Sequence, residues 1–99
     1  MHASIDIGTL IVRTPEIRND RPRVAGTGVT VSRIVSWYRL GLNAEEIADR
    51  IGHLTIAQVY AALTYYHANR PEIDDDLLRE AALADALERA HVSRHDARP

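Results

Sequence analysis

Two groups of side chains in this sequence are of types that bind metal ions. Asp74, Asp75 and Asp76 are consecutive carboxylates of the kind used by metal-dependent nucleases, and His91 and His95 are one helical turn apart, so they could share a metal ion. Neighbouring residues at a helix start point in different directions, so the three aspartates do not converge on one ion. The two histidines have no third ligand nearby. The sequence therefore predicts a charged helix start and solvated histidines, with no metal site.

No set of nucleophile, base and acid is recognisable in the chain. Cysteine is absent, which excludes a disulfide framework and a cysteine-ligated metal site. The segment Gly26-Thr27-Gly28 is rich in glycine, but it lacks the lysine and the helix that complete a phosphate-binding loop. A helical bundle of 99 residues leaves little room for a catalytic cleft. We expect a protein that is not an enzyme and that needs no cofactor.

A pair of helix starts separated by a glycine turn lies in the middle of the chain. Asn43 with Glu46, and Thr55 with Gln58, each have the spacing of a capping box, in which two side chains satisfy free N–H groups at the start of a helix. Gly52 between them can adopt a left-handed backbone that ends the first helix. Apolar residues follow each start at helical spacing. This order is typical of a helix-turn-helix, and it makes DNA binding a serious hypothesis.

The second helix of this pair is the one that would enter a major groove. Thr55, Gln58 and Ala61 are its predicted outward residues, and the Gln58 amide is of the type that pairs with an adenine edge. The helix has no arginine or lysine until Arg70, so phosphate contacts must come from other segments. The alternative is a dimerisation scaffold without DNA, in which Gln58 only caps the helix. The predicted DNA-contacting residues are Arg21, Arg23, Arg33, Arg50, Thr55 and Gln58.

The two ends of the chain carry opposite charge. Residues 1–40 hold six arginines against three carboxylates, whereas residues 71–99 hold four arginines against eight carboxylates. This asymmetry indicates two interaction surfaces of different preference. An amphipathic helix at the acidic end would lie either in the groove of a partner protein or on its own bundle or dimer mate. Its predicted apolar, partner-binding stripe consists of Leu77, Leu78, Ala81, Ala84 and Leu87.

The elements that must position these residues follow from helix caps and breakers. Residues 10–31 are prone to β structure and contain turns, so we expect two or three short strands with an edge at Leu10–Val12 that invites pairing with a second copy. Ser32 is expected to cap the first helix, and Gly41 to end it. Pro71 is expected to close the third helix because it cannot continue the backbone hydrogen bonding. The four predicted helices run from Ser32 to Leu40, Ala44 to Ile51, Ile56 to Asn69 and Asp74 to Val92.

Apolar and aromatic residues at helical spacing are expected to form the core. On the second helix of the pair, the stripe predicted to face inward consists of Ile56, Val59, Tyr60 and Leu63. The aromatic residues are expected to serve mainly in the core rather than to stack on bases. Tyr65 falls beside the stripe, where it could lie at a subunit interface.

The composition is that of a small globular domain. With 99 residues, of which 45% are apolar and 26% charged, one modest core is expected, and oligomerisation often stabilises such chains. We expect a homodimer of single domains, each with a β segment (1–31), a three-helix bundle (32–70) and an acidic helix with a tail (71–99). No segment has the length and apolarity of a membrane span, and residues 1–9 lack the pattern of a secretion signal, so a cytoplasmic location is expected.

Two segments, RVAGTGVTVSRIV and WYRLGLNAEEIADRIGHLTIAQVYAALTYY, carry a resemblance to the domain of unknown function 433 family. The family commonly has arginine and proline where this chain has Gly28 and Thr30. It also has a glycine followed by lysine or arginine before an early proline, where this chain has Asp20-Arg21. These departures concern contacts made by that loop and leave the implied fold intact. The resemblance implies a strand segment followed by a homeodomain-like helical bundle.

Members of that family are regarded as antitoxin-like, of the VapB type, and are often encoded beside a PIN-type ribonuclease toxin. The resemblance therefore implies the antitoxin of a type II toxin–antitoxin system, which neutralises such a toxin and is a candidate for binding operator DNA. The alternatives are a stand-alone DNA-binding transcriptional regulator and an interaction module that binds no nucleic acid. The expected fold is α+β, mainly α: a short N-terminal β segment, a homeodomain-like helix-turn-helix bundle and a C-terminal helix.

Overall fold

The chain folds into a bundle of helices with a small β segment beside it and a long terminal helix. The computed structural model describes residues 4–17 and 20–96, with side chains as far as His91. A 3-10 helix, Ile7–Thr9, precedes the strands β1 (Ile11–Val12) and β2 (Arg23–Val24). The helices are α1 (Val31–Arg39), α2 (Ala44–Ile51), α3 (Ile56–Ala68) and α4 (Arg70–Asp96). The fold is mainly α with a short antiparallel sheet, which confirms this part of the expected fold.

In the β segment, Ile11 lies opposite Val24 and Val12 opposite Arg23. Thr30 adds a single antiparallel bridge to Arg23, so β2 runs between two extended neighbours. This arrangement agrees with the predicted two or three short strands. Gly26 has a φ of +76° in the connection that leads from β2 back to Thr30, a backbone conformation that glycine adopts without steric strain. Pairing of the β1 edge with a second copy stays a prediction.

Helix α1 begins at a different cap from the one expected. Thr30 has an extended backbone, and its hydroxyl accepts a hydrogen bond from the Arg33 N–H at 3.2 Å. Ser32 lies inside the helix and is buried, and its hydroxyl donates to Glu80 of α4 at 2.6 Å. The prediction of a Ser32 cap was therefore wrong. Both serine and threonine are common helix caps, and here the Ser32 hydroxyl bonds a residue distant in sequence instead.

The two predicted capping boxes are confirmed. The Asn43 side chain accepts from the Glu46 N–H at 2.9 Å, and the Glu46 carboxylate accepts from the Asn43 N–H at 3.1 Å. Thr55 and Gln58 repeat the exchange at the start of α3, at 3.1 and 2.7 Å. Gly52 ends α2 with a φ of +84°, the left-handed conformation expected of it. The order helix, glycine turn, helix is thus formed by α2 and α3.

Replacing Thr55 with alanine is expected to lower the free energy of unfolding by about 1 kcal/mol, because the Gln58 N–H loses its acceptor. Urea denaturation of the two proteins measures the difference. Thr64→Ala is the matched control, since Thr64 is exposed within α3 and alanine favours a helix interior. A loss as large for Thr64→Ala as for Thr55→Ala would contradict a capping role.

The junction between α3 and α4 differs from the prediction. Helix α3 ends at Ala68 with Asn69 as its cap, and α4 begins at Arg70, so Pro71 lies in the first turn of α4. A proline is tolerated there because the N–H groups of a first turn have no partner within the helix. Helix α4 therefore starts before Asp74 and extends past Val92, beyond both predicted ends. The proline starts a helix instead of only ending one.

The core lies where α1, α2, α3 and the first turns of α4 meet the β segment. Its fully buried residues are Val24, Val31, Ile34, Val35, Ile47, Val59, Ala62 and Ile73. Ile11 and Trp37 pack against this cluster from its margin. Tyr66 is buried as well, but Tyr38 and Tyr60 are exposed, so only part of the aromatic residues serves the core as predicted.

The buried face of α3 is rotated relative to the predicted stripe. Ile56 and Tyr60 were expected to face inward, yet they are 45% and 57% exposed. Ala61 was expected to face outward, yet it is buried. Val59 and Leu63 are buried as predicted. Alanines complete the inward face, and they allow α3 to approach α1 closely; the prediction was wrong because it followed the larger side chains.

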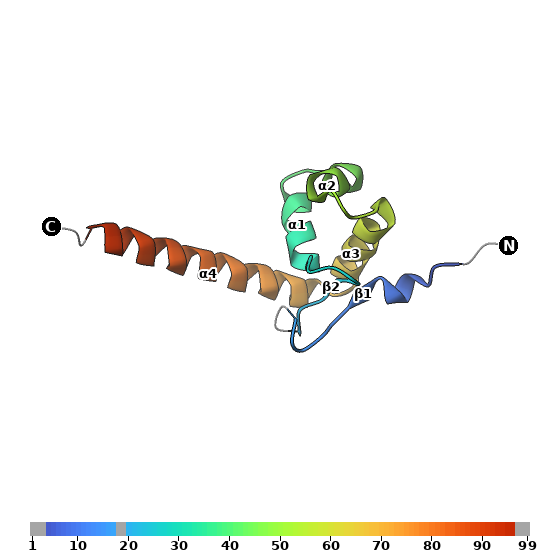
Figure 1. Ribbon diagram of the computed structural model, residues 1–99, viewed down its shortest axis with the longest axis horizontal. Coiled ribbons are helices and arrows are strands. Elements are labelled where there is room, and N and C mark those ends of the chain that lie inside the picture. Colours follow the sequence, from blue (N-terminus) through green and yellow to red (C-terminus); the bar gives the residue numbers. More distant parts are fainter. Residues whose placement is uncertain (1–3, 18–19, 97–99) are drawn as a thin grey trace.

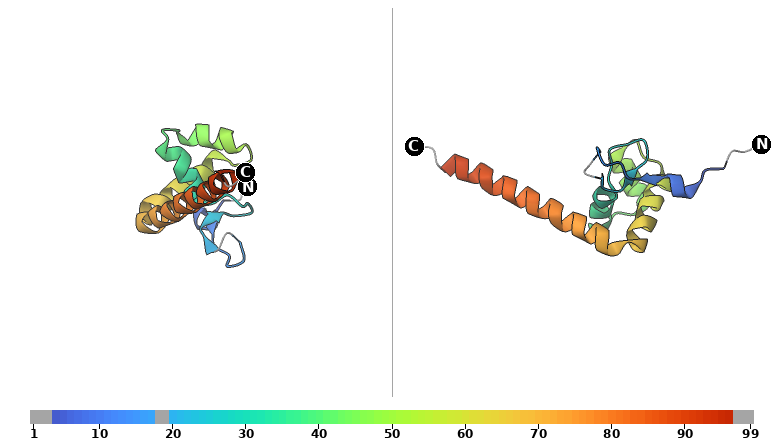
Figure 2. Two further views of the ribbon diagram at one scale, coloured as in Figure 1. Left: turned by 90° about the vertical axis from the view of Figure 1, so that its left-hand side faces the viewer. Right: turned by 90° about the horizontal axis from the view of Figure 1, so that it is seen from below.

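Helix α4 projects from the bundle and gives the molecule its elongated shape, with extents of 70 × 29 × 23 Å (Figure 1). Its first turns lie against α1 and α3, and the rest extends away from them, as the right-hand view of Figure 2 shows. The turn between α2 and α3 lies at the opposite side of the bundle from the free part of α4 (Figure 1). Within the described residues, no helix has the length and apolarity to cross a membrane.

Candidate functional site

The predicted base-reading residues lie at the exposed start of α3. Thr55 is exposed, and Gln58 is partly exposed. The two are bonded to each other in the capping box, so the Gln58 carbonyl oxygen already accepts the Thr55 N–H at 2.7 Å. A base edge would have to be read chiefly through the remaining amide N–H groups of Gln58. The start of α3 therefore has a polar surface, but its Thr55 and Gln58 side chains are already engaged in capping the helix.

Two of the four predicted phosphate-contacting arginines face solvent. Arg33 is exposed on α1, and Arg50 is exposed on α2, where its guanidinium lies over the Trp37 ring at 5.6 Å. Three exposed carboxylates lie on α2 together with Arg50, and they oppose the approach of a phosphate backbone there. These carboxylates are Glu45, Glu46 and Asp49.

The other two arginines are engaged within the fold. Arg23 is only 7% exposed, and its guanidinium donates to the Thr27 carbonyl at 3.2 Å and to the Thr14 hydroxyl at 2.8 Å. Arg21 is partly buried and forms an ion pair with Glu80 of α4 at 2.7 Å. Their placement argues against phosphate contact by Arg23 and makes such contact costly for Arg21, because its pair with Glu80 would have to open.

The predicted partner-binding residues of α4 do not form one stripe. Leu77 is partly buried against the core, whereas Leu78 is 69% exposed and lies on another side of the helix. Ala81, Ala84 and Leu87 are exposed. Beyond Glu80, a different set shares one face because its members are spaced three or four residues apart. We call this set the outer stripe; it consists of Leu83, Ala86, Leu87 and Ala90.

Sequence reasoning missed Leu83 although the sequence carries its signal. The spacing of the outer stripe is the ordinary pattern of an amphipathic helix. The predicted stripe combined the core-facing Leu77 with residues of other faces of the helix. In the structure, Leu83 and Leu87 are 59% and 62% exposed, and every residue from Ala81 to His91 is exposed.

Most of the acidic surplus of α4 is neutralised within the molecule. Ion pairs join the first part of α4 to arginines of the β segment and of α1; they are Arg13–Glu72, Arg21–Glu80 and Arg39–Asp74. The opposite charges of the two ends of the chain thus meet in the fold. The exposed part of α4 from 81 to 91 retains two carboxylates, Asp85 and Glu88, and one arginine, Arg89. Its apolar residues are therefore its main feature.

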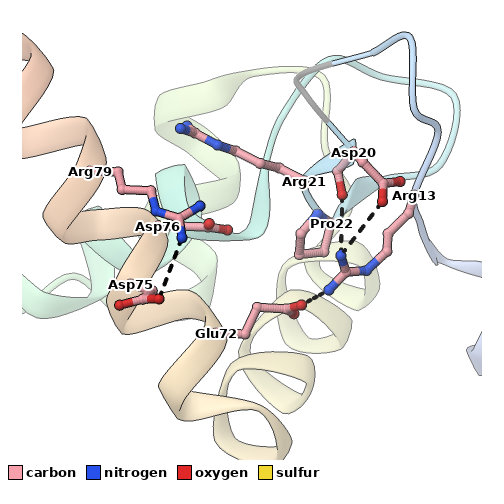
Figure 3. Close-up of a pocket in the computed structure, with 8 residues that line it drawn as sticks. All are labelled: Arg13, Asp20, Arg21, Pro22, Glu72, Asp75, Asp76 and Arg79. Atoms are coloured by element: carbon pink, nitrogen blue, oxygen red, sulfur yellow. Dashed lines mark hydrogen bonds and ion pairs between the residues drawn. The ribbon is translucent and has the colours of Figure 1, made fainter.

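A charged pocket of about 500 Å³ lies where the β segment meets α4 (Figure 3). Arg13, Asp20, Arg21 and Pro22 line it from the β segment, and Glu72, Asp75, Asp76 and Arg79 line it from α4. The Arg13 guanidinium joins both walls, because it contacts Glu72 and lies 4.0 Å from the Asp20 carboxylate. This pocket was not predicted from the sequence.

The three consecutive aspartates of α4 point in three different directions. Asp74 pairs with Arg39, Asp75 lies 3.7 Å from Arg79, and Asp76 faces the pocket. Among the residues that the structure describes, no cluster of three or more histidine and carboxylate side chains is placed to hold a metal ion. The side chain of His95 lies outside the described residues.

Asp76 is the buried member of the triplet, with 7% of its surface exposed. Burial raises the pKa of the Asp76 carboxyl above its ordinary value of 3.8, because a carboxylate is poorly solvated there. The nearby Arg21 acts in the opposite direction but does not cancel the effect. The folded protein therefore retains this proton at pH values where the unfolded chain has released it. Stability falls as the pH rises from about 3.8 through this window, and it stays lower above it.

Asp76→Asn is therefore expected to stabilise the free protein at pH 7, because asparagine resembles the neutral carboxyl. The gain should shrink as the pH falls and disappear below about 3.8, where Asp76 is protonated in both states. Urea denaturation of both proteins across this range measures the difference. Asp75→Asn, at an exposed position of the same turn, should show no such pH-dependent gain. A wild type that is more stable than Asp76→Asn at pH 7 would contradict the expected sign.

Comparison with known proteins gives one family. Residues 11–66, more than half of the chain, match the family described as "Protein of unknown function (DUF433)". A crystal structure of a DUF433 member protein from Anabaena variabilis is similar in fold, with a TM-score of 0.66 and 26% sequence identity over 71% of this chain and 69% of that chain. No curated protein matches the chain. The chain therefore belongs to the DUF433 family.

Proposed function

We propose that this protein is the antitoxin of a type II toxin–antitoxin pair and neutralises a PIN-type ribonuclease through the exposed part of α4. The observation that carries the proposal is the outer stripe on a helix segment without a packing partner among the described residues. Leu83 and Leu87 are more than half exposed there. Exposed leucines on one face of a projecting helix are typical of an interaction surface.

The long exposed part of α4 is expected to be stabilised by packing against a partner. An isolated helical segment of a few turns is marginally stable in water, and tertiary packing normally supplies the rest of its stability. The residues from Ala81 to His91 are all exposed, so the bundle supplies little packing there. A partner groove that covers the outer stripe would provide it. The internal ion pairs of α4 also imply that leucine burial, rather than net charge, contributes most of the affinity.

DNA contact is the second part of the proposal, and it concerns the opposite side of the bundle. The exposed start of α3 and the exposed Arg50 at the end of α2 support it. The carboxylates of α2 oppose it, so we assign partner binding the leading role. In a shift assay with the upstream region of its own gene, binding should fall steeply with salt. A protein that binds this DNA but no neighbouring protein would favour the stand-alone regulator instead.

Co-expression with the protein encoded beside this chain tests the antitoxin function. We expect a PIN-type ribonuclease there that co-purifies with the full chain and is inactive in the complex. A chain that ends at Ala82 should fold normally, because the buried Ile73, the partly buried Leu77 and the ion pair of Glu80 are retained. It should fail to bind and to inhibit. Inhibition by the shortened chain would contradict the proposed surface.

Point variants give a sharper test on the same helix. Leu83→Asp combined with Leu87→Asp should weaken binding about 30-fold or more, because buried interface anchors contribute at least about 2 kcal/mol. Leu78→Asp is the matched control, since Leu78 is as exposed but lies on another face. Equal losses for both would contradict the outer stripe. The remaining alternative is that a second copy of the chain covers the outer stripe. Light scattering of the free chain tests it: a dimer that the double variant abolishes would place a second copy on this face.

A further inference from the structure

The pocket between the β segment and α4 contains one buried carboxylate to which no described residue donates a hydrogen bond. Asp76 lines the pocket, and only 7% of its surface is exposed. Figure 3 shows its side chain reaching from α4 toward the loop that carries Arg21 and Pro22. Among the described residues, no hydrogen bond or ion pair within 4.0 Å joins Asp76 to another residue, whereas Asp74 and Asp75, which precede it, both have such partners.

The other charged groups of the pocket are already paired. Arg13 contacts Glu72 and Asp20, Arg21 binds Glu80, and Arg79 pairs with Asp75. The Tyr65 hydroxyl donates to Glu72 at 2.6 Å and fixes that carboxylate further. An anion would have to compete with these carboxylates for the arginines. Arg21, Arg79 and Arg13 favour the charged form of Asp76 electrostatically, but none of the described residues donates a hydrogen bond to it.

The chemistry of Asp76 defines what would complete the site. A buried carboxylate without donors is unfavourable, and charged N–H groups stabilise it better than neutral ones. A guanidinium offers five N–H donors in one plane, so it can bond Asp76 and still contact the rim. The volume of about 500 Å³ lies within the range of small-ligand pockets. A long side chain with a cationic end therefore fits both the size and the charge.

We infer that this pocket binds a guanidinium group, with Asp76 as its main acceptor, and that an arginine side chain of the bound partner protein supplies it. The choice of a partner arginine rests on the proposed function. The pocket and the outer stripe lie on the same face of α4, because Glu72, Asp76, Arg79, Leu83 and Leu87 follow one another at intervals of three or four residues. A protein segment laid on the leucines would thus extend toward the pocket.

N-acetyl-L-arginine amide is the probe that tests the pocket without the partner. In nitrogen–proton correlation spectra, the full-length protein should show saturable shifts of amides around the pocket at millimolar concentrations. N-acetyl-L-citrulline amide, which has nearly the same shape without the charge, should bind at least about tenfold more weakly. Absence of saturation up to about 50 mM arginine amide, or equal binding of the citrulline compound, would overturn the inference.

Two substitutions on one turn of α4 locate the site. Asp76→Asn should weaken binding of the arginine amide about tenfold or more, whereas Asp75→Asn should change it less than about twofold. Equal affinity of Asp76→Asn and wild type would also overturn the inference. Since the citrulline comparison uses the unmodified chain, it decides the question even where Asp76→Asn fails to fold.

The source of the guanidinium is decided with the complex. If a partner arginine occupies the pocket, the intact nuclease should displace the arginine amide, and Asp76→Asn should weaken nuclease binding as well. If the nuclease does not displace the arginine amide, the pocket binds a free guanidinium compound, and the proposal of a partner arginine is wrong. A chain that binds the amide but no nuclease would contradict the proposed function while it supports the pocket. If the chain binds the nuclease but not the arginine amide, the guanidinium site is wrong and the proposed function stands.

Discussion

Replacement of Ile73 with alanine is expected to lower the free energy of unfolding by about 2–5 kcal/mol. Ile73 is fully buried in the cluster that joins α4 to the bundle. Alanine would remove its apolar contacts and leave a cavity, because the surrounding helices close such a space only in part. A domain of this size is stabilised by about 5–15 kcal/mol, so the change would remove a large share of the total. Urea denaturation followed by circular dichroism measures the loss.

Leu83→Ala is the control for this result. Leu83 lies on the same helix but is 59% exposed, so the substitution should change stability by less than about 0.5 kcal/mol. The pair distinguishes the docked first turns of α4 from its exposed outer part. Similar losses for both variants would contradict this division. A negligible loss for Ile73→Ala would contradict the docking of α4 on the bundle.

The local features of the fold could be read from the sequence. Both capping boxes and the left-handed Gly52 were predicted, because each depends on residues at most three positions apart and on one backbone conformation. The mainly helical class and the short sheet follow from the same kind of local pattern. The family of the chain was predicted from two segments that lie entirely within the matched residues, 11–66.

Features that depend on distant partners could not be predicted. Ser32 caps no helix because Glu80, far along the chain, binds its hydroxyl. The buried face of α3 was predicted with the wrong rotation, because the space left by α1 favours alanines over the larger Tyr60. The charged pocket also depends on contacts between residues distant in sequence. Arg13 and Arg21 meet carboxylates of α4 only after the chain has turned back on itself, and spacing along a sequence does not reveal such pairs.

Arg23 is the predicted site residue whose placement differs most from the expectation, and its substitution should have the second large effect. Arg23→Ala is expected to lower the free energy of unfolding by about 2–4 kcal/mol, because the carbonyl of Thr27 and the hydroxyl of Thr14 lose a charged donor and a buried volume is emptied. Arg33→Ala, at an exposed position, should change stability by less than about 0.5 kcal/mol. Urea denaturation compares the two.

Arg23→Met separates the hydrogen bonds from the volume. The Arg23 Nε is buried without a partner among the described residues, so the guanidinium itself is imperfectly satisfied. Methionine keeps much of the volume and removes the cost of a buried cation, so this variant should be less destabilised than Arg23→Ala. If Arg23 instead served DNA, both variants would retain the stability of the wild type and lose affinity for DNA to the same extent as Arg33→Ala. If the Arg23 variants lose stability and Arg33→Ala does not, Arg23 serves the fold. There it joins the turn after β2 to the segment that follows β1.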